Sequence, residues 1–251
     1  MSNSYFQFKQ FKIFHDKCAM KVGTDGVLLG AWTSLDSLTN DLSKRVLDIG
    51  TGSGLIALMI AQRTSYINNI SIDALEIEEN AYTQASKNVM LSPWKDKIQT
   101  IQGDFTDTMI LKKLVNNSEL YQLIVSNPPY FVDSLNSPNK QRTVARHTQT
   151  GFNFNHLIKG VIRLLDTNGL FSLILPTDEA NKFIKLANDK KLYLTKRTNL
   201  LTKPGGKIRR VLMQFEKKKN HCTEDEMLIE ISRHQYSDEY KALTSEFYLD
   251  K

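Results

Sequence analysis

Short apolar runs alternate along this chain with longer stretches in which apolar residues recur at helical spacing. The short runs are bounded by Gly, Asn, Asp or Pro, which is typical of buried strands, and the longer stretches predict amphipathic helices. We expect strands at residues 45–49, 70–76, 98–103, 123–126, 170–175, 193–200 and 211–215. We expect helices at residues 55–63, 78–90, 152–165 and 178–188.

This alternation predicts an α/β fold. Strands joined through helices lie parallel in one sheet, with helices on both faces and ligands at the carboxyl ends of the strands. The last two strands are joined by a loop that contains Gly205 and Gly206, so they form a hairpin. The prediction is a seven-stranded, mostly parallel sheet in which strand 7 is antiparallel.

Composition narrows the class of protein. A chain of 251 residues without a low-complexity linker is expected to form a single domain, 1–251. No apolar run is long enough to cross a membrane and residues 1–10 do not look like a secretory leader, so a cytoplasmic protein is expected. Two cysteines and five histidines lack the spacing of metal ligands, so no metal is expected.

The most informative motif is Asn127-Pro128-Pro129-Tyr130, which follows the apolar run 123–125. Proline cannot continue a central strand, so the motif is expected to form a stiff, extended turn at the strand's end. There the Asn127 amide oxygen and a main-chain carbonyl can accept hydrogen bonds from a planar amino group, with the Tyr130 ring beside it. A purely structural turn is the alternative for this motif taken alone.

A glycine loop and two acids precede this motif. Gly50, Gly52 and Gly54 follow the first predicted strand, where glycines let the backbone approach a ligand closely. Their G-x-G-x-G spacing differs from the dinucleotide and P-loop motifs. Asp48, just before the loop, suits a ligand with an ammonium group, and Glu76 ends the second strand, where an acid binds ribose hydroxyls. Together they predict a ligand with a ribose and a cationic group.

The net charge of +6 is compatible with a nucleic-acid partner. Basic residues gather after the Asn-Pro-Pro-Tyr motif and around the Pro-Gly-Gly loop. The first group contains Arg142, Arg146 and His147, and the second contains Lys203, Lys207, Arg209 and Arg210. Both groups lie at one edge of the predicted sheet, which favours a shared anionic partner. Each group taken alone is equally compatible with a solvated loop.

Several motifs, taken in order, resemble those of class I S-adenosylmethionine-dependent methyltransferases that act on amino nitrogens. They are residues 48–54, Glu76, Gly103-Asp104-Phe105 and Asn127-Pro128-Pro129-Tyr130. Residues 6–11, 15–26, 28–32, 127–135, 141–143, 145–148 and 236–251 are similar to the bacterial tRNA adenine N6-methyltransferases that modify position 37 of valine tRNA. The resemblance spans essentially the whole chain and implies a Rossmann-like class I methyltransferase fold.

The resemblance implies S-adenosylmethionine as the cofactor. Gly50, Gly52 and Gly54 would line its methionine and ribose part, Glu76 would bind the ribose hydroxyls, and Asp104 would bind the adenine amino group.

Two further parts of the chain take roles from the same resemblance. Phe105 would contact the adenine face. Lys21, Gly23 and Thr24 match the segment that closes over the methionine end, although a simple turn is the alternative. The chain would then consist of a closing segment, a core and an extension, at residues 1–40, 41–216 and 217–251.

The chemistry places Asn127 at the reactive centre. The lone pair of adenine N6 is delocalised into the ring, so the amine is a poor nucleophile. Hydrogen bonds from N6–H to the Asn127 oxygen and the Pro128 carbonyl would draw charge onto the nitrogen, while Pro129 stiffens the turn and Tyr130 stacks on the base. The methylated nitrogen loses its proton readily, so His147 is not assigned as a base. It would contact the base or a phosphate, or be structural.

The implied partner is the anticodon loop of a tRNA, where the bases are already unpaired. The basic residues of both groups are candidates for holding its backbone, and a monomer without membrane contact is expected. Asn-Pro-Pro-Tyr also serves transfer to a protein glutamine amide or to adenine in DNA, and the motif alone does not separate these substrates. An inactive RNA-binding module is the non-enzymatic alternative.

Overall fold

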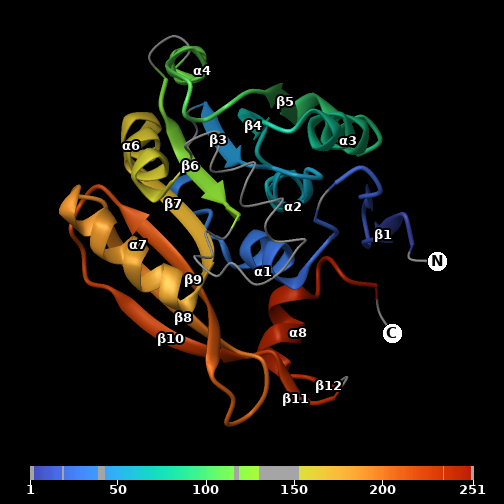
Figure 1. The fold of residues 1–251 in the computed structure, drawn as a ribbon. Coiled ribbons are helices and arrows are strands. Elements are labelled where there is room, and N and C mark those ends of the chain that lie inside the picture. Colours follow the sequence, from blue (N-terminus) through green and yellow to red (C-terminus); the bar gives the residue numbers. More distant parts are fainter. Residues whose placement is uncertain are drawn as a thin grey trace, which may run out of the picture.

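The computed structural model describes residues 3–18, 20–38, 43–115, 119–129, 153–233 and 235–249. Its main sheet contains β3 (Lys44–Ile49), β4 (Ile70–Glu76), β5 (Ile98–Gln102), β6 (Tyr121–Ser126), β7 (Leu165–Pro176), β8 (Tyr193–Leu201), β9 (Ile208–Glu216) and β10 (Thr223–Leu228). The strand order is β10-β8-β9-β7-β6-β3-β4-β5 (Figure 1). Neighbouring strands are parallel except for β9, which is antiparallel to both β7 and β8.

The predicted α/β class, with its mostly parallel sheet and antiparallel seventh strand, is therefore confirmed. The sheet also has an eighth strand that we did not predict, because β10 pairs in parallel with β8 at the edge. The run that forms β10 contains three acids, and its first four residues are exposed, so its sequence does not have the apolar pattern of a buried strand.

Helices cover both faces of the sheet. They are α1 (Thr24–Trp32), α2 (Leu55–Arg63), α3 (Glu79–Met90), α4 (Thr108–Leu114), α6 (Phe154–Leu164), α7 (Thr177–Asp189) and α8 (Asp238–Thr244), with 3-10 turns η1 (Asp36–Leu38) and η2 (Lys95–Lys97). Apolar residues of α1, α2, α3 and α8 join one hydrophobic cluster, and those of α4, α6 and α7 join the other. Adjacent strand residues enter opposite clusters, as Val46 and Leu47 do on β3, because side chains alternate across a sheet.

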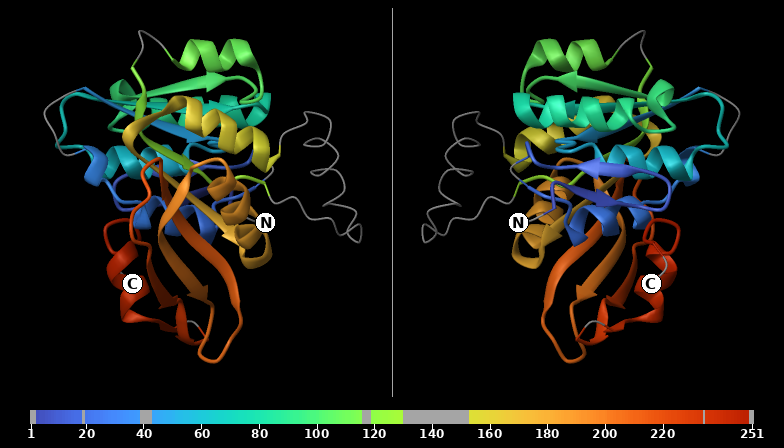
Figure 2. Two further views of the ribbon diagram at one scale, coloured as in Figure 1. Left: turned by 90° about the vertical axis from the view of Figure 1, so that its left-hand side faces the viewer. Right: turned by 90° about the vertical axis from the view of Figure 1, so that its right-hand side faces the viewer.

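Two small hairpins lie outside the main sheet: β1 (Tyr5–Gln7) with β2 (Lys12–Phe14), and β11 (Glu230–Ser232) with β12 (Gln235–Tyr236). The N-terminal and C-terminal segments pack on the same cluster, to which Phe8, Phe11, Tyr240 and Phe247 belong. The two segments are joined where the Lys9 N–H donates to the Phe247 carbonyl (2.8 Å). Figure 2 shows the C-terminal segment, in red, beside the long β8–β9 hairpin.

The strand that follows the third predicted helix begins earlier in the sequence than expected. Helix α6 ends at Leu164, and β7 begins at the next residue. Gly169 therefore lies inside β7, where a Cβ atom would come within 2.9 Å of the Tyr121 carbonyl oxygen. This glycine permits a close approach of β7 to β6. No helix within the described ranges combines the length and apolar character needed to cross a membrane.

A buried polar cluster ties the amino ends of three central strands together. The Asp73 Oδ2 on β4 accepts hydrogen bonds from Arg45 on β3 (2.8 Å) and from the Tyr121 hydroxyl on β6 (2.6 Å). The Arg45 guanidinium also lies 4.2 Å from the centre of the Tyr121 ring. Burial, together with the nearby Asp73 carboxylate, raises the pKa of Tyr121, so its hydroxyl keeps the proton that it donates.

Replacing Tyr121 by Phe should destabilise the fold by about 1–2 kcal/mol, because Asp73 loses one donor while keeping Arg45. The free energy of unfolding, measured with urea, tests this. Tyr66→Phe is the matched control, since Tyr66 is 74% exposed and should change stability by less than about 0.5 kcal/mol. Equal stabilities of Tyr121→Phe and the wild type would show that the buried hydroxyl contributes nothing.

Candidate active site

The glycine loop lies at the carboxyl end of β3 and is bound to the end of the next strand. Gly50, Gly52 and Gly54 have φ angles of 70°, 58° and 83°, in the left-handed region that favours glycine. The N–H groups of Gly50 and Thr51 both donate to the Leu75 carbonyl, at 2.9 and 3.0 Å. The sequence therefore placed this loop correctly, and the positive φ angles give the physical reason for its glycines.

The space beside the loop is open. A Cβ atom built at Gly50 or Gly52 would meet no atom within 4 Å, whereas one at Gly54 would lie 3.6 Å from Ala85 on α3. The first two glycines thus face room for a ligand, and the third packs against the neighbouring helix. This geometry fits a bound cofactor whose atoms lie against the backbone.

The Glu76 carboxylate holds the loop in place. Its Oε2 accepts a hydrogen bond from the Gly52 N–H (2.8 Å), and its Oε1 accepts from the N–H groups of Ile77 and Glu78 (both 3.0 Å). Burial raises the pKa of Glu76, and these three N–H groups oppose the rise. A carboxylate has about four lone-pair positions, so about one remains for a ligand hydroxyl.

Asp104 and Phe105 follow β5, the next strand along the sheet. The Gly103 N–H donates to the Glu76 carbonyl (2.9 Å), which fixes this turn beside Glu76. The Asp104 Oδ1 accepts from the N–H and hydroxyl of Thr106, at 2.7 and 2.8 Å. Its other oxygen has no hydrogen-bond partner among the residues that the structure describes.

Phe105 is more buried than a residue that only stacks on a ligand. It is 5% exposed and belongs to the cluster beneath α6. A Cβ atom at Gly160 on α6 would lie 2.3 Å from its ring, so the ring packs directly against that helix. Phe105 thus has a core role that the sequence did not reveal, and at most a small part of it can touch a cofactor.

Asp48 is fully buried beneath the loop. Its Oδ2 accepts from the Thr51 hydroxyl (2.6 Å) and the Ala57 N–H (3.1 Å). Its Oδ1 has no hydrogen-bond partner among the described residues. Burial raises the pKa of Asp48 to about 7, with a further contribution from the Glu76 carboxylate, while the bonds from Thr51 and Ala57 oppose the rise. A buried carboxylate oxygen without a donor among the described residues suits a ligand with N–H donors.

Asn127 leaves β6 next to the glycine loop. Ile49 and Ser126, the last residues of β3 and β6, are paired, and the Ser126 hydroxyl donates to the Ile49 carbonyl (2.9 Å). The loop and Asn127 therefore emerge from neighbouring strands about 5 Å apart. The Asn127 Oδ1 is buried and, within the described ranges, has no hydrogen-bond partner. A buried amide oxygen without a donor is costly unless a ligand supplies one.

The remainder of the motif is only partly described. Pro128 is buried and Pro129 half-buried, as expected of a rigid turn. Tyr130 lies outside the described residues, as do Arg142, Arg146 and His147, so their predicted roles stay predictions.

The predicted closing segment leads into α1. Lys21, Gly23 and Thr24 are exposed, and Thr24 is the first residue of the helix. A Cβ atom at Gly26 would lie 3.1 Å from Leu55, the first residue of α2. The start of α1 therefore lies beside the helix that follows the glycine loop.

Cys18 precedes this segment and is half-buried. Burial raises the pKa of Cys18 to about 12, and the Glu76 carboxylate adds to the rise. The N–H of the neighbouring Lys17 donates to the Gln84 side chain on α3 (3.4 Å), so this part of the chain lies beside the helix that follows Glu76.

The basic residues around the Pro-Gly-Gly loop lie on the β8–β9 hairpin. Lys203, Lys207 and Arg209 are exposed, while Arg210 forms an ion pair with Asp25 on α1 (2.8 Å). Sequence analysis did not identify Asp25, because its partner is 185 residues away in the chain and nothing local indicates the pair. The described residues contain no cluster of three or more His, Cys, Asp or Glu side chains that could hold a metal ion.

Comparison with known proteins shows which family the chain resembles. The family described as "Methyltransferase small domain" matches residues 24–151. A tRNA1(Val) (adenine(37)-N6)-methyltransferase of Bacteroides thetaiotaomicron is 49% identical over 99% of both chains. A protein of the same name from Flavobacterium psychrophilum is 45% identical over 97% of this chain and 99% of its own.

The fold also matches a solved structure. A predicted O-methyltransferase from Agrobacterium tumefaciens superposes with a TM-score of 0.67 at 16% identity, over 89% of this chain and 96% of that one. At this level of identity the likeness concerns the fold alone.

The raised pKa of Asp48 predicts a pH dependence of stability. The folded state binds the Asp48 proton more tightly than the unfolded state, so its contribution to stability is full below pH 4 and is lost as the pH rises to about 7. Asp48→Asn removes this titration. Glu76 titrates in both proteins, so only the change in its interaction with residue 48 enters their difference. The stability of the wild type relative to the variant should fall by roughly 1–4 kcal/mol between pH 4.5 and pH 7.5.

Urea unfolding at several pH values measures this difference. Asp225→Asn is the control, because Asp225 is exposed on the edge strand β10 and its profile should parallel that of the wild type. Parallel profiles for Asp48→Asn and the wild type would contradict the assignment.

Proposed function

The chain belongs to the tRNA1(Val) (adenine(37)-N6)-methyltransferase family, and on this premise we propose that it methylates N6 of adenine-37 in the anticodon loop of tRNA1(Val). The observation that carries the proposal is the buried Asn127 Oδ1, which lacks a partner among the described residues and lies next to an open glycine loop. An exocyclic amino group supplies the donor that this oxygen lacks.

The residues at the carboxyl edge fit S-adenosylmethionine, which supplies an electrophilic methyl group when bound. Gly50 and Gly52 would lie against its methionine and ribose part, and the Asp48 Oδ1 is an acceptor for N–H donors on that side. Glu76 would bind one ribose hydroxyl with its remaining lone pair. The free oxygen of Asp104 would accept from the adenine amino group.

Two parts of this cofactor site have additional structural roles. Phe105 would contribute only the edge that α6 leaves accessible. Lys21, Gly23 and Thr24 would close over the methionine end, because α1 begins beside α2. Asn127 would lie between the cofactor and the substrate.

Asn127 would orient and activate the substrate amine. Its amide oxygen and the Pro128 carbonyl would accept the two N6–H hydrogen bonds, which hold the amine in the plane of the acceptors and increase charge on its nitrogen. Pro129 would keep these acceptors at a fixed spacing, and Tyr130 would stack on the base, worth about 1–3 kcal/mol. Positioning of the amine then supplies much of the rate. The nitrogen becomes acidic as its new bond forms, so no general base is required and His147 is not assigned as one.

Basic side chains around this edge would hold the RNA backbone. Arg142 and Arg146 follow the motif in sequence, and Lys203, Lys207 and Arg209 are exposed on the β8–β9 hairpin. A tRNA substrate implies a cytoplasmic protein. We further propose that residues 1–251 act as one domain and as a monomer. The hydrophobic cluster that the terminal segments share with the core supports the single domain.

A protein glutamine amide and adenine in DNA are the alternative substrates for this motif. Both present a planar nitrogen with a delocalised lone pair, so the Asn127 geometry does not separate them. Relatives that match over nearly the full length and carry a tRNA methyltransferase name favour RNA. An inactive RNA-binding module has no use for an open glycine loop beside an Asn127 Oδ1 that lacks a donor among the described residues.

Replacing Asn127 by Ala should lower the rate of N6-methyladenosine formation by about 100-fold or more, as removal of a charge-stabilising group does in other enzymes. Affinity for S-adenosylhomocysteine should change less than about threefold, because Gly50, Gly52 and Glu76 remain. Nucleoside mass spectrometry of tRNA and calorimetry measure the two quantities. Asn155→Ala, at an exposed position of α6, is the matched control. Unchanged methylation by Asn127→Ala would exclude the mechanism.

Neutralising Lys203 and Lys207 together, both to Gln, should weaken tRNA binding and reduce its salt dependence. The slope of log Kd against log salt should fall by about one for each phosphate that is no longer neutralised. Cofactor affinity should not change. The control is a variant in which Lys218 and Lys219 are both changed to Gln. These two residues follow β9, at the opposite edge of the sheet. Identical slopes for the two double variants would rule out the hairpin as an RNA-binding element.

A further inference from the structure

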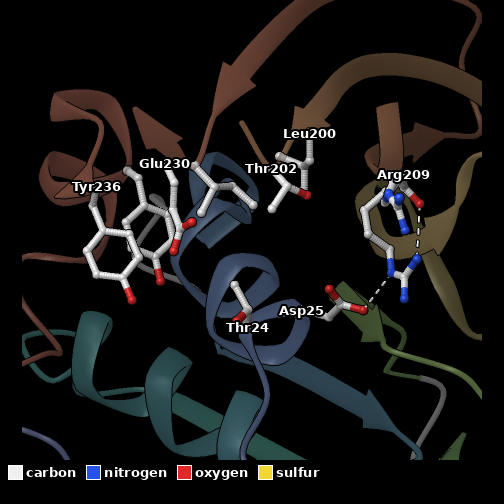
Figure 3. A pocket seen from close by; sticks show the side chains of 10 residues that line it. Thr24, Asp25, Leu200, Thr202, Arg209, Glu230 and Tyr236 are labelled. Atoms are coloured by element: carbon white, nitrogen blue, oxygen red, sulfur yellow. Dashed lines mark hydrogen bonds and ion pairs between the residues drawn. The ribbon is translucent and has the colours of Figure 1, made fainter. Parts of the chain in front are cut away.

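A cavity of about 330 Å³ lies where the start of α1, the β8–β9 hairpin and the C-terminal segment meet (Figure 3). Its volume falls near the lower end of small-molecule sites, roughly 300–1,000 Å³. Its walls include Thr24, Asp25, Arg209, Arg210, Glu230 and Tyr236. It shares Thr24 with the proposed cofactor-binding residues, but neither Asn127 nor the glycine loop lines it.

The cavity nevertheless opens at the same edge of the sheet as Asn127. Strand β9 is antiparallel to β7, so its first residues lie with the carboxyl ends of the parallel strands, where Arg210 pairs with Pro176. On the other side of β7, Leu173 pairs with Ser126 of β6. Arg210 lies two strand spacings from β6, with β7 between them, and its partner Pro176 lies three residues beyond Leu173 on β7. Together these offsets place Arg210 about 14 Å from the end of β6. One or two nucleotides of single-stranded RNA cover that distance.

One side of the cavity is suited to a phosphate. The ion pair with Asp25 holds the Arg210 side chain, and the Arg210 Nη1 donates to the Arg209 carbonyl (3.0 Å). The exposed Arg209 guanidinium makes no hydrogen bond or ion pair with any other described residue. Figure 3 shows Arg209 across the cavity from Glu230 and Tyr236. A guanidinium presented in this way binds phosphate through two parallel hydrogen bonds.

The opposite side is suited to a base. Tyr236 and Glu230 are directly paired across the β11–β12 hairpin, so their side chains lie on the same face. The Tyr236 ring is half-buried and stacks on Tyr240, with ring centres 4.8 Å apart. The Glu230 N–H donates to the Thr202 carbonyl (3.0 Å), which fixes this hairpin to the end of β8. The Glu230 carboxylate has no hydrogen-bond or ion-pair partner in the described part of the chain and can accept from a base amino group.

We propose that this cavity binds a second nucleotide of the RNA, one or two positions from the target adenosine, with its phosphate at Arg209 and its base against Tyr236, where the base amino group can reach the Glu230 carboxylate. The inference rests on the proposed function and adds a recognition site to it. The base is one that presents an amino group, because a carboxylate accepts hydrogen bonds and cannot donate them. The C-terminal segment thereby gains a role as one wall of an RNA-binding site.

The test combines changes in the protein with changes in the RNA. tRNA1(Val) is assembled by ligation around synthetic anticodon arms, each with one abasic nucleotide at a loop position other than the target. For the wild type, removing the bound base should raise Kd about tenfold, and the other positions within two nucleotides should matter less. Tyr236→Ala and Glu230→Gln should each weaken binding of intact tRNA by about three- to tenfold. On the tRNA that lacks the bound base, each variant should lower the affinity by less than about a further twofold.

Controls separate folding from recognition. Glu230→Gln keeps the shape of the side chain, so it remains informative if Tyr236→Ala, which loses the stack on Tyr240, unfolds. Affinity for S-adenosylhomocysteine should stay at the wild-type value in both variants. Tyr66→Ala and Glu226→Gln, at exposed positions outside the cavity, should bind every RNA as the wild type does.

The outcomes also separate the two proposals. The nucleotide cavity would be overturned if the affinity losses from the protein variants added to those from the abasic nucleotide at every loop position. It would also be overturned if Glu230→Gln bound intact tRNA as tightly as the wild type does. In both cases the wild type would still methylate adenine-37. Failure of the wild type to bind or methylate intact tRNA1(Val) would instead overturn the proposed function and the cavity's assignment with it.

Discussion

The hydrogen bond from the Gly52 N–H to the Glu76 carboxylate fixes the geometry on which the site depends. It joins the loop after β3 to the end of β4, and the Ser126 hydroxyl joins β3 to β6 in a similar way. Three strand ends are thereby held in one arrangement by buried groups. Backbone N–H groups use three of the lone pairs of the Glu76 carboxylate, so Glu76 could support the loop and still accept a hydrogen bond from a ligand.

The two halves of the sheet carry different kinds of candidate binding residues. Strands β3, β4 and β5 carry the glycine loop, Glu76 and Asp104, which suit a nucleoside cofactor. Strands β8 and β9, with the C-terminal segment, carry exposed cations and two stacked tyrosines, which suit RNA. Asn127 leaves β6 between these halves. The Asp48 and Asn127 oxygens that have no partner among the described residues belong to the centre of the sheet, where a cofactor and a substrate would meet.

The sequence was sufficient for the features that depend on local pattern. The seven predicted strands, the glycine loop and the position of Asn127 follow from short apolar runs, several of which are followed by Gly, Asn or Pro. Helix α1 was not predicted, because seven of its nine residues are buried and no polar face marks it. The Asp25–Arg210 ion pair and the packing of Phe105 against Gly160 join residues far apart in the chain. Such interactions depend on the assembled sheet, so no local pattern reveals them.

The position of β9 between β7 and β8 has a consequence for synthesis on the ribosome. Strand β8 leaves the exit tunnel before β9, yet it cannot pair with β7, because β9 occupies that place. The largely apolar edge of β7 therefore stays without a partner until residue 216 has emerged. An open edge of this kind invites pairing with other chains. The nascent protein is thus most exposed to aggregation, and most in need of a chaperone, while the β8–β9 hairpin is being made.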